Sequence, residues 1–174
     1  MKRLALIVGM VVCLSSHSPL EARESKETKA KLSAAKSIFL GWVDLPADGW
    51  GLWGYPNQEA WMDAIKTLNL NFQSNCRSNY LPGPLVTAAK DRNDENAAGS
   101  DLYIKFSDVH IDPETYGVSL SIHFIDPKTS TEIASVPSQL YYERRLFQFA
   151  SYVSAALDDV GLEVQSFVGA RRRK

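Results

Sequence analysis

The chain is poor in cysteine, poor in histidine and almost without net charge, and each scarcity excludes a class of protein. It contains two cysteines and three histidines, and its formal net charge is −1 at pH 7. Two cysteines cannot build the disulfide framework of a small secreted domain. A zinc site needs three or four convergent ligands, and a near-neutral chain exerts no long-range pull on nucleic acid. We therefore expect no metal and no nucleic-acid partner.

The sequence also lacks a stretch that is long and apolar enough to cross a bilayer, so we expect no transmembrane segment. An apolar run at residues 4–14 follows Lys2 and Arg3, which is the pattern of a secretion signal. We predict that residues 1–22 are a signal peptide and that the protein is periplasmic or secreted.

The two cysteines have different expected roles. Cys13 lies where a bacterial lipoprotein carries its lipidated cysteine, but Val12 stands where a small residue belongs. Simple export is therefore preferred to a lipid anchor at Cys13. Cys76 continues the apolar spacing of a helix and is predicted to be a small buried hydrophobe rather than a reactive thiol.

A chain of 174 residues has room for one domain and one core. Residues 23–36 are charged and are predicted to be a linker or a frayed helix. Residues 37–168 form the predicted α+β domain, and residues 169–174 form a basic, disordered tail.

Alternating apolar and polar residues between 101 and 136 predict three antiparallel strands. The buried parity changes at Ser107-Asp108, which predicts a bulge there. Residues 37–45 are rich in strand formers and predict a first strand covered on both faces. A short strand is expected near 85–89.

Apolar residues spaced three and four positions apart predict two helices. The first begins after Asn57 as N-cap, and the second follows Val136-Pro137 and ends at Gly161 as a cap. Residues 162–168 are either a last strand or a helical tail. Together these elements predict a two-layer α+β sandwich, with a mostly antiparallel sheet and both helices on one face.

Two short motifs carry a family resemblance. Ser100-Asp101 opens one strand, and Asp126-Pro127-Lys128-Thr129 ends the next. The pattern resembles bacterial envelope proteins that include the curli-secretion lipoprotein, the lipoprotein activators of penicillin-binding proteins and the N-terminal domain of the Tol translocation protein. The resemblance implies non-enzymatic accessory work. Ser130 replaces the family's glycine, and a left-handed serine would cost on the order of 1 kcal/mol.

The least ordinary composition lies at residues 46–57, with three glycines, two tryptophans and a tyrosine. Residues 49–54 spell G-x-G-x-x-G, but bulky Trp50 and Trp53 stand between the glycines and the helix starts beyond them. We therefore expect no nucleotide cofactor. Either Trp50, Trp53 and Tyr55 fold down as a lid, or at least one Trp stays exposed as a binding platform.

Other candidate chemistry lies on the strands. Asp108, His110 and Asp112 alternate along one strand and could form a weak metal or acid–base site. A solvated strand face that ends in a turn explains them more simply. Ser119 and His123 share an outer strand face without a nucleophile motif.

The sequence therefore favours an exported, non-catalytic binding or accessory protein of the bacterial cell envelope. Its expected binding residues are Trp50, Trp53 and Tyr55, and its expected partner is an envelope protein or a peptidoglycan or other saccharide. Two alternatives stay open. One is a small secreted hydrolase or metal-dependent enzyme that uses Asp108, His110 and Asp112, and the other is a structural subunit of an envelope assembly.

Overall fold

The protein is described by a computed structural model that covers residues 26–48, 50–51, 53–112, 114–115, 117–141 and 149–169, with backbone alone at Tyr141 and Phe149. The predicted signal peptide, the lipidation position Cys13 and the basic tail beyond Gly169 lie outside these residues. The helical elements are α1 (Lys26–Ser33), α2 (Gln58–Asn75), the π-helical turn η1 (Cys76–Tyr80) and α3 (Phe149–Val168). The strands are β1 (Ser37–Leu40), β2 (Leu85–Ala88), β3 (Leu102–Asp112), β4 (Gly117–Asp126) and β5 (Thr131–Tyr141).

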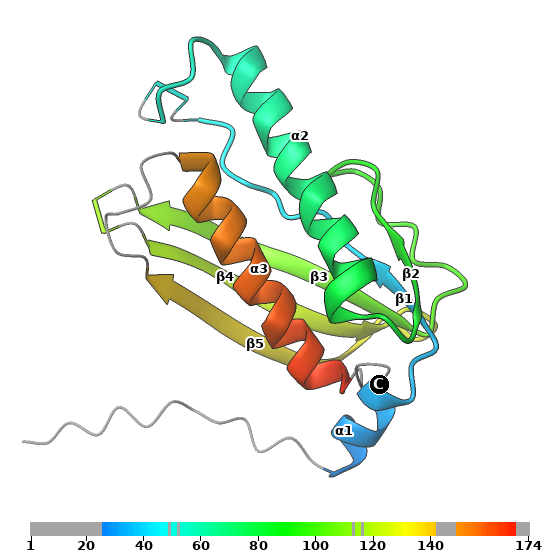
Figure 1. The fold of residues 1–174 in the computed structure, drawn as a ribbon. Coiled ribbons are helices and arrows are strands. Elements are labelled where there is room, and N and C mark those ends of the chain that lie inside the picture. Colours follow the sequence, from blue (N-terminus) through cyan, green and yellow to red (C-terminus); the bar gives the residue numbers. More distant parts are fainter. Residues whose placement is uncertain are drawn as a thin grey trace, which may run out of the picture.

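The strands of the described chain form one five-stranded sheet in the order β2-β1-β3-β4-β5. β1 is parallel to β2 and β3, whereas β3–β4 and β4–β5 are antiparallel. Parallel neighbours need a crossover, and α2 supplies it between β1 and β2. α2 and α3 lie on the same face of the sheet (Figure 1). The predicted two-layer α+β sandwich is confirmed.

The core lies between that face and the two helices. Asn57 caps α2 as predicted, since its side chain accepts a hydrogen bond from the Ala60 N–H at 2.9 Å. The predicted apolar stripe is buried and consists of Trp61, Ile65, Leu68 and Phe72 in α2 and Cys76 at the start of η1. The inward residues of β3 and β4 are also buried: Leu102, Ile104, Phe106, Val118, Leu120, Ile122 and Phe124. Periodicity therefore identified the core correctly.

Two positions to which the sequence pattern drew attention have an irregular backbone. The β3–β4 register shifts between Ser107 and His110, and Asp108 has a φ of 53°, so the predicted bulge is confirmed. Ser130, in the turn between β4 and β5, has a φ of 53° as well. The turn thus keeps a left-handed residue even though serine replaces glycine.

Three predicted boundaries were wrong. β1 ends at Leu40 rather than at residue 45, because the N–H and C=O of Val43 bond to the Asn69 side chain of α2 instead of to a strand. β5 runs through Pro137 to Tyr141. It is an edge strand, where proline is tolerated because one side of the strand needs no partner.

The third wrong boundary concerns α3, which passes through Gly161 and includes the ambiguous residues 162–168. Gly161 is therefore not a cap. It is buried against the ring of Tyr80, and the left-handed residue after the helix is Gly169, with a φ of 67°.

The segment expected to be a linker or a frayed helix contains α1, whose Leu32 is buried in the main core. Lys31 also forms an ion pair with Asp126 at 2.9 Å. Among the helices that the structure describes, none is long and apolar enough to cross a membrane.

Candidate functional site

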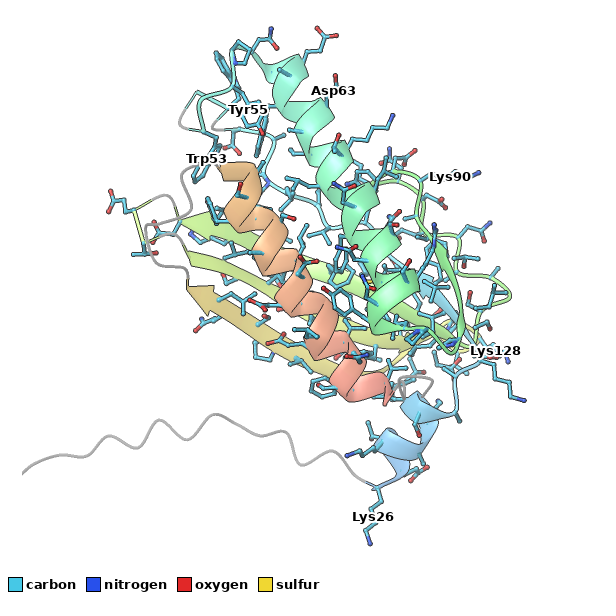
Figure 2. The ribbon with its side chains drawn as sticks, viewed as in Figure 1. Lys26, Trp53, Tyr55, Asp63, Lys90 and Lys128 are labelled. Carbon is cyan, nitrogen blue, oxygen red and sulfur yellow. The ribbon has the colours of Figure 1, made fainter. Side chains whose placement is uncertain are left out.

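The loop that carries the expected binding residues is fixed by two of its aromatics. The ring of Trp53 lies 5.9 Å from that of Tyr152 in α3, and the ring of Tyr55 lies 5.1 Å from that of Trp61 in α2. Figure 2 shows Trp53 and Tyr55 at the end of the molecule where α2 begins, with Trp53 beside the start of α3. Both side chains are half-buried, so they attach the loop to the helices.

Trp50 behaves differently from its two neighbours. Its side chain is 39% exposed, although the loop around it is closed by a 3.0 Å hydrogen bond from the Tyr55 N–H to the Trp50 carbonyl. The two open interpretations of the loop thus apply to different residues: Trp53 and Tyr55 pack down, and Trp50 remains available. Gly49 and Leu52 lie outside the described residues.

The G-x-G-x-x-G string does not form a phosphate cradle in the described part of the loop. α2 begins at Gln58, beyond the last glycine, and the Asn57 side chain already caps its first turn. A dinucleotide fingerprint instead places the helix N-terminus within the motif, so that free N–H groups face the pyrophosphate.

The three strand residues of the enzyme alternative are not brought into one cluster. Asp108 lies at the bulge and accepts a hydrogen bond from the Ser107 hydroxyl at 2.7 Å. Asp112 accepts hydrogen bonds from the Thr115 hydroxyl and the Glu114 N–H, which hold the pKa of its carboxyl below the usual value. His110 is exposed and shares with Asp112 a hollow of about 260 Å³. The hydrogen bonds of the Asp112 carboxylate with Glu114 and Thr115 stabilise the turn that follows β3.

Across the described residues, no group of three His, Cys, Asp or Glu side chains is placed to hold a metal ion. His110 and Asp112 together supply two donors, fewer than a zinc site requires. The hollow beside them therefore has a polar wall that includes His110 and Asp112.

Sequence patterns missed a hydrogen-bonded network on the face of the sheet opposite the helices. His123 Nε2 lies 2.8 Å from Ser107 Oγ, and His123 Nδ1 lies 2.7 Å from Glu132 Oε2. The network joins β3, β4 and β5. No residue spacing in the sequence indicates this network, because the network depends on the register of three strands.

The order of these groups is that of a Ser-His-acid arrangement. Ser107 has one hydroxyl hydrogen and two acceptors within hydrogen-bond distance, Asp108 Oδ2 at 2.7 Å and His123 Nε2 at 2.8 Å. The contacts of His123 with Ser107 and Glu132 link the three strands side by side across the sheet.

Two buried polar side chains of α2 position the chain on either side of it. Asn69 accepts from the Val43 N–H at 2.8 Å and donates to the Val43 carbonyl at 3.0 Å. Gln73 donates to the Ala89 carbonyl at 2.8 Å. The neighbouring Trp42 and Lys90 are thereby held in fixed places. The signal that could have identified this arrangement is the presence of two amides on an otherwise apolar helix face.

The chain matches no protein-family model and no curated protein. Among solved structures it is similar to PelC from Paraburkholderia phytofirmans, crystallised as a dodecamer, with 14% identity, a TM-score of 0.47, and coverage of 79% of this chain and 89% of PelC. It is also similar to a Helicobacter pylori protein described as a homologue of a neuraminyllactose-binding hemagglutinin, with 12% identity, a TM-score of 0.44, and coverage of 77% and 86%.

Proposed function

We propose that this chain is a non-catalytic binding or accessory protein, exported to the bacterial cell envelope, that contacts its partner through the loop at residues 49–55. The observation that carries the proposal is the exposed Trp50, which precedes in the same loop the two aromatics, Trp53 and Tyr55, that attach the loop to α3 and α2. Export rests on the signal pattern of residues 1–22, and accessory work on the resemblance of the two strand motifs; both remain predictions.

A fixed loop favours binding because less conformational freedom is lost when a partner is engaged. The Trp61 indole N–H donates to the Pro46 carbonyl at 2.9 Å, which attaches the segment before the loop to α2. Tryptophan is enriched among the residues that dominate protein interfaces. An envelope protein is therefore the partner that we favour, and a wall saccharide is the second candidate.

The test is affinity capture from an envelope extract with the wild type, with Trp50→Ala and with a matched control. Leu162→Ala is the control, because Leu162 on α3 is also a large apolar side chain that is 46% exposed. We expect Trp50→Ala to lose a partner that the wild type and Leu162→Ala both retain. Identical partner sets for all three proteins would contradict the proposal, and loss of purified wall saccharide instead of protein would identify the second candidate.

A further inference from the structure

Two hollows that include no residue of the loop at residues 49–55 meet at Trp42. The larger, of about 340 Å³, lies between α2 and residues 90–92, and the smaller, of about 150 Å³, lies between residues 92–95 and β3. Trp42, Asp44 and Arg92 line both hollows. The two hollows therefore adjoin at Trp42 and at the ion pair of Arg92 with Asp44, 4.0 Å apart, and we call them together the Trp42 groove. The larger is in the size range of small-molecule sites, about 300–1,000 Å³.

Two buried side chains of α2 hold the walls of this groove in place. Asn69 holds Val43, next to Trp42, and Gln73 holds Ala89, next to Lys90. Both amide side chains are almost completely buried. Because burying an amide is costly unless its hydrogen bonds are satisfied, these contacts fix the two walls relative to α2 and pre-organise the groove.

The larger hollow combines an apolar floor with a rim of both charges. Leu45 and Ile65 contribute buried apolar surface, and Met62 is partly exposed. Its described lining residues include three carboxylates (Asp44, Asp63 and Asp91) and three cations (Lys66, Lys90 and Arg92). Figure 2 shows Asp63 and Lys90 on the same flank of α2. The balanced rim favours a ligand without net charge over an anion or a cation.

The smaller hollow adds a second aromatic with a polar tip. The rings of Tyr103 and Phe39 are 5.5 Å apart, which supports Tyr103 from behind. Burial, followed by the charges of Glu95 and Asp94, raises the pKa of Tyr103 to about 12. Like that of an ordinary tyrosine, its hydroxyl is protonated at neutral pH. Lys105 and Glu95 form an ion pair at 2.8 Å in the same hollow.

We propose that this groove binds an uncharged oligosaccharide, with one sugar ring against the Trp42 indole in the larger hollow and the chain continuing over Trp42 into the smaller one. A pyranose has an apolar C–H face for an aromatic ring and an edge of hydroxyl groups that both donate and accept hydrogen bonds. Carboxylates and cations on one rim, such as Asp44 and Arg92, which form an ion pair at 4.0 Å, can accept from and donate to such hydroxyls. The site shares no residue with the loop at residues 49–55 and goes beyond the function proposed above.

The test is NMR titration of the ¹⁵N-labelled protein with three probes: the β-1,4-linked tetramer of N-acetylglucosamine, cellotetraose and the anionic tetramer of galacturonate. We expect one of the two neutral tetramers to shift the indole N–H signal of Trp42 at millimolar concentration, and galacturonate to bind more weakly. Assignment of the four tryptophan signals comes from single Trp→Phe variants.

The decisive variants change the groove without removing its support. Trp42→Ala should weaken binding at least about tenfold, which corresponds to about 1.4 kcal/mol. Trp42→Phe keeps a ring in the cluster with Phe39 and Tyr103 and should recover part of the affinity. Asp63→Asn changes an exposed side chain and should weaken binding several-fold. Leu162→Ala is the control and should bind like the wild type, because Leu162 is exposed on α3 and lines neither hollow.

Three results would overturn the proposal. The first is the absence of any Trp42 shift with both neutral tetramers, and the second is unchanged affinity in Trp42→Ala and Asp63→Asn. The third is a shift confined to Trp50, which would place the saccharide on the loop. The affinity capture that tests Trp50 can contradict its proposal while the NMR titration supports binding at Trp42, because the two tests change different residues.

Discussion

The turn between β4 and β5 contains Ser130, whose φ of 53° lies in the region that glycine occupies most readily. A β-carbon in this conformation costs on the order of 1 kcal/mol. We therefore predict that Ser130→Gly raises the free energy of unfolding by up to about 1 kcal/mol, measured by urea denaturation.

The neighbouring Thr129 provides the matched control, since its φ is not positive. Thr129→Gly frees the unfolded chain without relieving a strained backbone and should lower stability. If both glycine variants lose stability, Ser130 is not strained and the prediction is wrong.

Cys76 is completely buried at the end of α2. Burial, together with the nearby charge of Asp158, raises the pKa of its thiol to about 12. Since the thiolate is the reactive form, we predict that Cys76 does not react with a disulfide reagent at pH 8 in the folded protein and reacts fully in guanidinium. Replacing Cys13 by serine leaves Cys76 as the one thiol for this measurement. Rapid labelling of the native protein would contradict the prediction.

At the scale of elements, α3 packs closely against η1 at Gly161. A β-carbon added there would meet the ring of Tyr80, whose hydroxyl donates to Asp158 at 3.1 Å. We predict that Gly161→Ala lowers the free energy of unfolding by about 1–3 kcal/mol, because overpacking outweighs the helix propensity that alanine gains.

A double-mutant cycle isolates this contact. In the Tyr80→Leu background, Gly161→Ala should cost much less, because the ring is absent. Gly51→Ala serves as the control, since a β-carbon there would meet no atom within 4 Å. Equal losses for Gly161→Ala in both backgrounds would show that the helix itself, rather than its packing on η1, carries the cost.

Helices and strands whose apolar residues repeat at a regular spacing could be predicted from the sequence, but the residues at which they end could not. The α2 stripe and the alternation of β3 and β4 depend on local spacing alone. The end of β1 depends on Asn69, a residue 26 positions away from Val43 that takes over its hydrogen bonds. The length of β5 depends on its place at the edge of the sheet, which tolerates Pro137. Both facts belong to tertiary structure.

At the scale of the whole molecule, one candidate site could be predicted from the sequence and the other could not. The Trp50 loop could be identified because its composition is unusual over a dozen consecutive residues. The groove at Trp42 could not, because it combines α2 with segments near residues 42 and 92 that meet only in the folded chain. The network of His123 likewise requires the register of three strands.

Two carboxylates tie distant parts of the molecule together at one end of the sheet. Asp101 accepts hydrogen bonds from the N–H groups of Lys36 and Ser37, and so joins β1 to the start of β3. Asp126 accepts from Lys31 and from the Lys128 N–H, and so joins α1 to the β4–β5 turn. These hydrogen bonds hold the pKa values of both carboxyls below their usual range. The short motifs that contain these residues thus have a structural purpose.

Lowered pKa values make stability depend on pH in a defined direction. The unfolded chain takes up protons on these carboxyls first, so their contribution is complete above the unfolded pKa and is lost as the pH falls through the folded pKa. We predict that Asp101→Ala has a lower Tm than the wild type at pH 7, and that the difference shrinks once the pH falls below about 4. Differential scanning calorimetry of both proteins between neutral and acid pH measures this convergence. A Tm difference that stays constant across that range would mean that Asp101 acts through its shape rather than its charge, and the two strands would then be joined mainly by their backbone ladder.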